Sequence, residues 1–228
     1  MYSGSIYQAG KPRLSISVTN DAALPLLVVR GEREGPVLAV SAAVHGDEYE
    51  GVRAIFEVFD LLDPAELSGT PLAMPVVNGA AHRACTRTNP ADSLNLARVF
   101  PGDPQGTITQ RIAHTFGCEV IAKADFYLDL HSGGVRYAMP SIAGYEATDL
   151  RSAPVIWGHL AIEQGRNISF ARERGIPFLY TEARGAGRHL GILRSSRIRE
   201  AHACESQKPR LLVWCMRCPP WSAEKRYS

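Results

Sequence analysis

The sequence predicts an α/β fold in which a mixed, largely parallel sheet carries helices on both faces. Two observations support this prediction. Segments with the composition of strands alternate along the chain with segments that have helical spacing. Several of the expected strands are apolar at consecutive positions, which is typical of strands that are buried on both faces of a parallel sheet. The 228 residues are enough for one sizeable domain of this kind.

The expected strands are short apolar, β-branched runs bounded by turns. A charged turn over residues 31–36 separates the first two of them. The expected strands are Leu24–Arg30, Val37–Val44, Pro71–Val77, Phe126–Leu130 and Pro177–Thr181.

The expected helices are amphipathic segments between these strands. In the first of them apolar residues recur at intervals of three and four, and Asp63-Pro64 ends the pattern. A turn at Arg174-Gly175 precedes the last strand. The expected helices are Tyr49–Leu62, Gln105–Phe116 (with Thr107 or Gly106 as cap) and a segment near Ser152–His159.

The bulk composition excludes several classes of protein. The formal net charge of +2 gives no indication of a nucleic-acid or anionic-membrane partner. The longest apolar stretch, Pro36–Val44, is far shorter than the roughly 20 residues that a membrane span needs. Met1–Val18 lacks the pattern of a signal peptide. With five cysteines, an odd number, reduced thiols and a cytoplasmic location are expected.

His45 and Glu48 are the first candidates for metal ligands. They follow the expected strand Val37–Val44, and open α/β sheets bind ligands at the carboxyl ends of their strands. Imidazole nitrogen and carboxylate oxygen suit zinc. Taken alone, such a pair is more often a polar strand-to-helix turn. Asp47 is interpreted as the N-cap of the following helix, with Glu50 completing a capping box.

His131 is the third candidate ligand, because it also ends a short apolar strand. Two histidines and one glutamate leave a fourth tetrahedral position open for water, as in catalytic rather than structural zinc sites. Asp129 lies two residues earlier, on the same strand face. It either orients His131 through a hydrogen bond or pairs with a nearby arginine.

Two further segments carry candidate residues for catalysis and substrate binding. Arg87 and Arg98 lie in an arginine-rich segment that ends in the expected tight turn Phe100-Pro101-Gly102. Arginines near a metal can bind a substrate carboxylate in bidentate fashion, although a solvated surface charge is their usual role. Glu182 ends the last expected strand. Beside a zinc site, a glutamate can accept a proton from water and pass it to a leaving amine.

These four segments, in their order along the chain, resemble the succinylglutamate desuccinylase/aspartoacylase family of the zinc carboxypeptidase superfamily. The resemblance runs from about Val28 to Gly187. It implies a zinc carboxypeptidase-like fold and one Zn²⁺ per chain, held by His45, Glu48 and His131. It also implies that Glu182 is the general acid/base.

The resemblance extends to the substrate site with one departure. Arg87 matches a substrate-carboxylate arginine, and Arg98 matches the arginine of the family's Asn-Arg pair. The family often has Asn-Leu-Asn-Arg where this chain has Asn95-Leu96-Ala97-Arg98. Ala97 cannot donate an amide hydrogen bond, so either Asn95 or another group replaces it, or the substrate is not an acidic N-acyl amino acid.

The expected function is zinc-dependent hydrolysis of the amide bond in a small N-acyl amino acid, with Glu182 as the base. Three alternatives remain open: a carboxypeptidase that acts on peptides, a deacylase for esters or N-acetyl-diamino acids, and a non-catalytic zinc-binding remnant. A small-molecule substrate is the only expected partner, with no nucleic acid and no membrane. The sequence does not indicate an oligomeric state.

The expected organisation is a catalytic domain over residues 1–187 followed by an aberrant, poorly folded tail over residues 188–228. The tail holds nine Lys or Arg and three Asp or Glu, whereas the rest of the chain is net acidic. It has no sustained helical or strand period, and a shifted reading frame is one hypothesis for its origin. Cys215 and Cys218 lack the second cysteine pair that a zinc ribbon needs.

Overall fold

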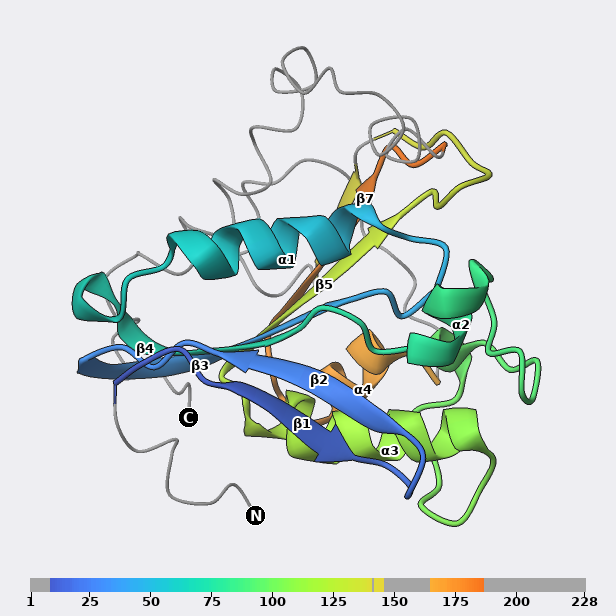
Figure 1. Cartoon of the computed structure of the whole chain (residues 1–228), viewed down its shortest axis with the longest axis horizontal. Coiled ribbons are helices and arrows are strands. Elements are labelled where there is room, and N and C mark those ends of the chain that lie inside the picture. Colours follow the sequence, from blue (N-terminus) through green and yellow to red (C-terminus); the bar gives the residue numbers. More distant parts are fainter. Residues whose placement is uncertain (1–8, 141, 146–164, 187–228) are drawn as a thin grey trace.

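The computed structural model describes residues 9–140, 142–145 and 165–186 of the chain. These residues form one seven-stranded sheet with the strand order β1-β2-β4-β3-β5-β7-β6 (Figure 1). The strands are β1 Arg13–Ser17, β2 Ala23–Val28, β3 Arg33–Ala42, β4 Ser68–Met74, β5 Phe126–Ser132, β6 Ile142–Tyr145 and β7 Phe178–Ala183.

The sheet is mixed and parallel at its centre, which confirms the predicted fold class. Strands β4, β3, β5 and β7 run parallel to one another, and β1, β2 and β6 add antiparallel edges. All five predicted strands are present, with bounds shifted by a few residues. The edge strands β1 and β6 were not predicted, and both are short.

Helices cover both faces of the sheet, as expected. In Figure 1, α1 lies on one face and α3 and α4 lie on the other, while α2 lies beside the ends of the central strands. The α-helices are α1 Glu50–Leu61, α2 Gly79–Ala84, α3 Ile108–Glu119 and α4 Asn167–Glu173, and the 3₁₀ turns are η2 Pro64–Glu66, η3 Leu96–Arg98 and η4 Ile121–Lys123. None of the helices in the described residues has the length and apolar character that a membrane span needs.

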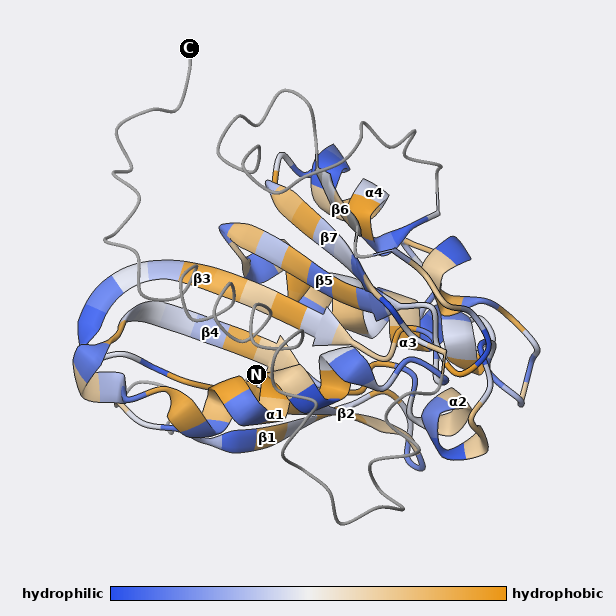
Figure 2. Ribbon diagram, turned by 90° about the horizontal axis from the view of Figure 1, so that it is seen from above, coloured by the Kyte–Doolittle hydropathy of each residue, from blue (hydrophilic) through white to orange (hydrophobic). Residues whose placement is uncertain are grey.

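Two apolar cores result, one on each side of the sheet. Under α1, Ile55, Val58 and Phe59 pack with the inward residues of β3 and β5. On the other side, Phe116 of α3 and Phe170 of α4 pack against the opposite strand faces. Hydrophobic residues therefore run along much of β3, β5 and β7 (Figure 2), as the apolar runs in the sequence predict.

The start of α3 is as predicted, and the start of α1 is not. Thr107 caps α3 in a complete capping box with Gln110. At α1 the N-cap is Tyr49 and no side chain caps the helix, so the prediction that Asp47 and Glu50 form a capping box is wrong. Glu50 instead accepts a hydrogen bond from Ser132 Oγ.

Asp47 is buried against the loop that follows β5. Gly134 there has φ of +61°, and a Cβ at that position would lie 2.8 Å from Asp47 Oδ2. Only a glycine therefore suits this contact, because a side chain would be strained and too close. Close packing of the two loops thus replaces the predicted cap as the role of Asp47.

The predicted turn at Arg174-Gly175 is confirmed, since Arg174 ends α4 and Gly175 has φ of +67°. The predicted helix at Ser152–His159 and the predicted tail over residues 188–228 lie outside the described residues. The division of the chain into a domain and a tail therefore stays a prediction.

We expect Phe116→Ala to lower the free energy of unfolding by about 3–5 kcal/mol, because a fully buried ring is removed from the core under α3. Urea unfolding of the full chain measures this change. Phe56→Ala, at a side chain that is 37% exposed, is the matched control and should change stability by less than about 1 kcal/mol. Equal losses in the two variants would contradict the described core.

Candidate metal centre and active site

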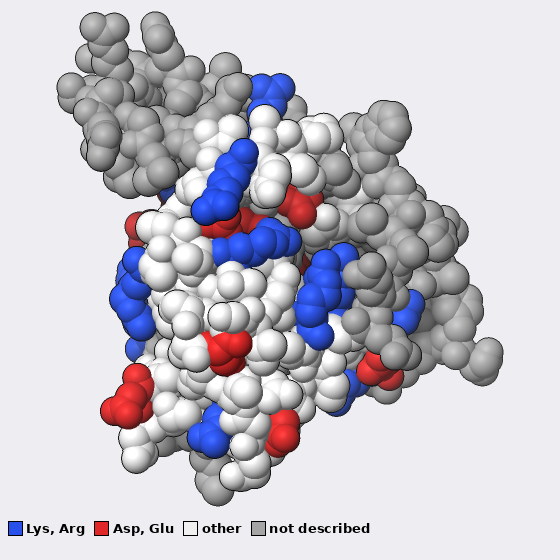
Figure 3. Space-filling view, turned by 90° about the vertical axis from the view of Figure 1, so that its right-hand side faces the viewer, with Lys and Arg blue, Asp and Glu red and all other residues white. Residues whose placement is uncertain are grey.

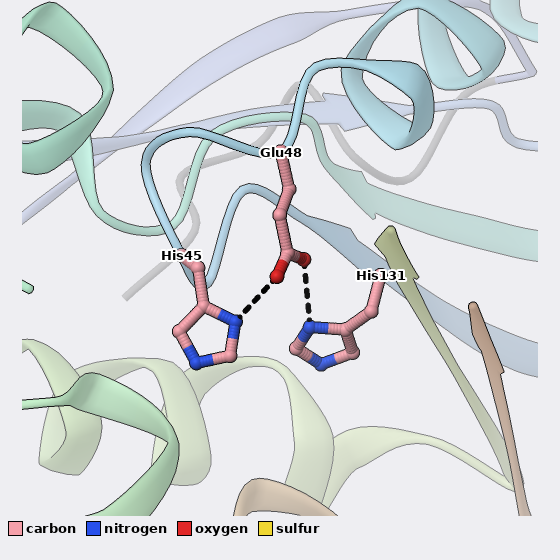
Figure 4. Close-up of side chains that lie close together, drawn as sticks. All are labelled: His45, Glu48 and His131. Carbon is pink, nitrogen blue, oxygen red and sulfur yellow. Dashed lines mark hydrogen bonds and ion pairs between the residues drawn. The ribbon is translucent and has the colours of Figure 1, made fainter. Parts of the chain in front are cut away.

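The three candidate metal ligands come together at the carboxyl ends of the central strands. His45 and Glu48 lie in the loop between β3 and α1, and His131 lies near the end of β5 (Figure 4). All three are buried, and one ligand atom from each lies within 4.8 Å of the others. Two segments that are distant in the sequence thus form one compact cluster.

Both histidines present the same ring nitrogen to the same carboxylate. His45 Nδ1 lies 2.8 Å from Glu48 Oε1, and His131 Nδ1 lies 2.9 Å from Glu48 Oε2. The Nε2 atoms face away, His45 Nε2 toward Asn95 Oδ1 at 3.2 Å and His131 Nε2 toward Asp129 Oδ2 at 2.6 Å. The two Nδ1 atoms and the carboxylate therefore converge on one point.

This donor set fits the zinc ion that the sequence pattern implies. Two imidazole nitrogens and one carboxylate oxygen are the usual protein ligands of catalytic zinc. A partner at Nε2 fixes the tautomer in which Nδ1 carries the lone pair that a metal needs. Among the described residues, His45, Glu48 and His131 are the single group of this kind.

The electrostatic setting keeps the ligand carboxylate ionised. Burial by itself raises the pKa of Glu48, but the charge of His131 and hydrogen bonds from both histidines lower it well below its usual range. Burial lowers the pKa of His45. Burial also acts to lower the pKa of His131, but the charges of Asp129 and Glu48 raise it well above its usual value. Both carboxylates at the site are therefore ionised, and a metal ion bound between the histidines would displace the hydrogen from His131 Nδ1.

A pocket lies directly beside the cluster, and it is rich in arginine. Figure 3 views the molecule from this side and shows basic side chains interleaved with acidic ones on the upper part of the face. The described residues that line the pocket are His45, Arg87, Ala97, Arg98, Asp129, His131, Arg166, Asn167, Ile168, Tyr180 and Glu182.

Arg87 and Arg98 both line the pocket, which they reach from the segment between α2 and α3. Arg87 Nη1 donates to Glu48 Oε1 at 3.2 Å, so its guanidinium lies at the edge of the candidate metal centre. Arg98 lies at the end of η3 and donates from Nη1 to the Ala97 carbonyl at 2.9 Å. The two arginines thus line the pocket from different positions.

Glu182 lies next to His131 because β5 and β7 are in register at this point. Residues paired across parallel strands share a sheet face, so both side chains face the pocket. Tyr180 Oη donates to Glu182 Oε1 at 2.9 Å, and Oε2 has no hydrogen-bond partner among the described residues. Burial raises the pKa of the Glu182 carboxyl. A carboxylate with a raised pKa is a stronger base than an ordinary glutamate.

Asn95, the third residue predicted to bind substrate, contacts His45 and caps η3. The described residues that line the pocket do not include it. Its Oδ1 accepts from the Ala97 backbone N–H at 2.9 Å, which caps η3, and lies 3.2 Å from His45 Nε2. The structure therefore places Asn95 behind a candidate metal ligand rather than along the pocket.

Of the two interpretations of Asp129, the structure favours the orientation of His131. Its described hydrogen bonds are with His131, Ser41 and Asn167, rather than with an arginine. Burial raises the pKa of Asp129, but the charge of His131 and these hydrogen bonds lower it below its usual value.

Sequence reasoning missed Arg166, Asn167 and Tyr180, which also line the pocket. Tyr180 could have been found, because a residue two positions before Glu182 on a strand shares its face. Arg166 and Asn167 begin a helix that no apolar periodicity indicated. No spacing in the sequence connects them with the other candidates.

The described chain is thus an α/β domain with a mixed sheet and a buried His-Glu-His cluster at its strand ends. The chain belongs to the succinylglutamate desuccinylase/aspartoacylase catalytic-domain family, whose model matches residues 34–190. This membership agrees with the resemblance seen in the sequence.

One curated relative is the N-alpha-acetyl-L-2,4-diaminobutyric acid deacetylase of Halomonas elongata, 38% identical over 127 residues. The match covers 53% of this chain and 37% of the relative, so it spans little more than a third of that protein's length.

Solved structures show the same fold over most of the chain. The ectoine utilization protein EutE (DoeB) of Ruegeria pomeroyi aligns with a TM-score of 0.76 and 26% identity, over 94% of this chain and 69% of that one. A succinylglutamate desuccinylase/aspartoacylase from Rhodobacter sphaeroides aligns with a TM-score of 0.73 and 26% identity, over 94% and 68%.

We expect His131→Ala to abolish stoichiometric zinc binding, because it removes one of three ligands and leaves the Glu48 carboxylate with one histidine. Elemental analysis after dialysis against zinc measures the metal content. His114→Ala on α3 is the control and should keep the metal. Equal metal content in wild type and His131→Ala would contradict this ligand set.

Proposed function

We propose that this protein is a zinc-dependent hydrolase that cleaves the amide bond of a small N-acyl amino acid. One observation carries the proposal: a single pocket brings Glu182 and three arginines beside the cluster of His45, Glu48 and His131. The family match and the deacetylase relative support the same class of reaction.

Zinc would be held by His45, Glu48 and His131. When bound there, it supplies a Lewis acid that polarises a carbonyl group and lowers the pKa of water toward about 7. The remaining steps belong to side chains of this chain.

Glu182 is the proposed general base and acid. Because Tyr180 holds Oε1, the second oxygen of Glu182 is the atom that we assign to proton transfer. It accepts a proton from the attacking water and then delivers that proton to the nitrogen of the departing amine. The raised pKa of Glu182 makes its ionised form a stronger base toward the water.

The arginines have two proposed tasks. Arg87, which contacts Glu48, is close enough to the cluster to stabilise negative charge on the carbonyl oxygen as the water attacks. Arg98 and Arg166 line the rest of the pocket and are suited to bind the substrate carboxylate. Binding the carboxylate at one place fixes which amide lies beside Glu182.

A second, narrower candidate is deacetylation of an Nα-acetyl-diamino acid. Two observations favour it. The Halomonas relative is named for such a substrate. Ala97 lines the pocket where an asparagine is common in the family, so the side chain at this position offers no hydrogen-bond donor to a second acidic group.

A substrate panel tests the proposal. N-acetyl-L-2,4-diaminobutyrate, N-acetyl-L-aspartate, N-succinyl-L-glutamate and a short peptide are each incubated with the full chain and zinc. The proposal predicts hydrolysis of at least one N-acyl amino acid, loss of activity on chelation and recovery when zinc is restored. Cleavage of the peptide alone would indicate a carboxypeptidase, and zinc binding without turnover would indicate a non-catalytic remnant.

We expect Glu182→Gln to lower kcat by about 10²–10⁴-fold while zinc content stays at the wild-type level, because the amide cannot accept the proton. Steady-state kinetics together with elemental analysis check this result. Glu173→Gln, an exposed position at the end of α4, is the matched control. A variant with nearly wild-type kcat would remove Glu182 from the mechanism.

We expect Arg98→Lys to raise KM roughly tenfold with a smaller change in kcat, since a guanidinium makes paired hydrogen bonds that an ammonium cannot reproduce. The matched comparison is a substrate analogue in which a carboxamide replaces the carboxylate, for which wild type and variant should have similar KM values. If KM rose equally for both compounds, Arg98 would not bind the carboxylate.

A further inference from the structure

We propose that Ser41, Tyr127 and Asn167 are positioning residues for the metal centre, and that they act on His131 through Asp129. The proposal rests on the proposed zinc site but is independent of which substrate is cleaved. None of the three was identified as a site residue from the sequence, and Ser41 and Tyr127 do not line the pocket as described.

The three side chains form a closed hydrogen-bonded group around Asp129. Ser41 of β3 donates from Oγ to Asp129 Oδ1 at 2.5 Å and lies 2.7 Å from Tyr127 Oη. Asn167 of α4 donates from Nδ2 to Asp129 Oδ2 at 2.6 Å and to Tyr127 Oη at 2.7 Å. Two strands and one helix therefore meet at a single carboxylate.

Complete burial makes these contacts obligatory. Ser41, Tyr127 and Asp129 are 0% exposed and Asn167 is 2% exposed. A buried polar group that loses its partner incurs the full cost of its desolvation. The arrangement therefore has little freedom to change unless a partner is removed.

The direction of each hydrogen bond follows from the inventory of donors. Asn167 uses its two amide hydrogens for Asp129 and Tyr127, so the Tyr127 hydroxyl hydrogen remains for Ser41. The hydroxyl hydrogen of Ser41 goes to Asp129. Each side chain of the group therefore donates either to the Asp129 carboxylate itself or to a neighbour that donates toward that carboxylate.

The direction of these hydrogen bonds determines which nitrogen of His131 carries a hydrogen. Asp129 is left as a pure acceptor, so the hydrogen bond to His131 Nε2 requires an N–H at that nitrogen. When a metal ion displaces the hydrogen from Nδ1, the Nε2–H stays on Asp129, and Nδ1, the atom that faces Glu48, supplies the lone pair. The group therefore selects the tautomer and fixes the ring orientation that a metal requires.

Asn167 adds a connection to the substrate side of the pocket. It is the first residue of α4 and directly follows Arg166, and both residues line the pocket. The helix that presents an arginine to the substrate is thus held against the same carboxylate that orients His131. If these residues only stabilised the fold, their removal would not change the zinc affinity of the folded protein. Zinc affinity therefore distinguishes a positioning role from a purely structural one.

The experiment compares zinc dissociation constants for the full chain carrying Ser41→Ala, Tyr127→Phe or Asn167→Leu, measured by competition with a chromophoric chelator. We expect each variant to bind zinc roughly tenfold more weakly than wild type. Thr109→Val is the matched control, because it also removes a buried hydroxyl that donates to an aspartate, Asp92, away from the proposed ligands. Its zinc affinity should equal that of wild type.

Unfolding curves of the zinc-free proteins identify variants that do not fold. If Asn167→Leu fails to fold, the zinc affinities of Ser41→Ala and Tyr127→Phe test the proposal instead, since each of these variants removes only a hydroxyl group. Zinc affinities within twofold of wild type in the folded variants would overturn the proposal, as would a wild type that does not bind zinc. Weakened zinc binding in the variants without hydrolysis of any N-acyl amino acid by wild type would support the network and refute the proposed function.

Discussion

The Glu48 carboxylate, buried between two histidines, is the interaction on which the rest of the site depends. A carboxylate in this position is costly unless positive charge and hydrogen bonds surround it. His45, His131 and Arg87 supply them from three different segments of the chain. The loop after β3, the end of β5 and the segment after α2 therefore have to meet at one point, and strand ends of a parallel sheet allow this meeting.

The same sheet face serves as core at one end and as site at the other. On β5 and β7, Tyr127 and Phe178 pack toward α3 and α4. Two residues further along each strand lie Asp129 and Tyr180, and two further lie His131 and Glu182, each pair in register. The rigidity that the apolar core gives these strands thus extends to the atoms proposed to hold a metal and to transfer a proton.

Much of the fold and of the candidate cluster could be predicted because the signals are local. The apolar runs show the central strands, and His45, Glu48 and His131 stand where such strands end. Contacts between distant segments could not be predicted. The sequence does not show that Asn95 faces His45, nor that Asn167 reaches Asp129 across the sheet. Asp47 was misassigned because its loop packs against Gly134, a contact 87 positions away that no cap rule includes.

X-ray absorption spectroscopy at the zinc edge of the zinc-loaded full chain tests the central claim most directly. Ligation by His45, Glu48 and His131 predicts a first shell of nitrogen and oxygen alone at about 2.0–2.2 Å, with the multiple-scattering signature of two imidazoles. A sulfur shell at about 2.3 Å, or a spectrum without imidazole, would contradict it.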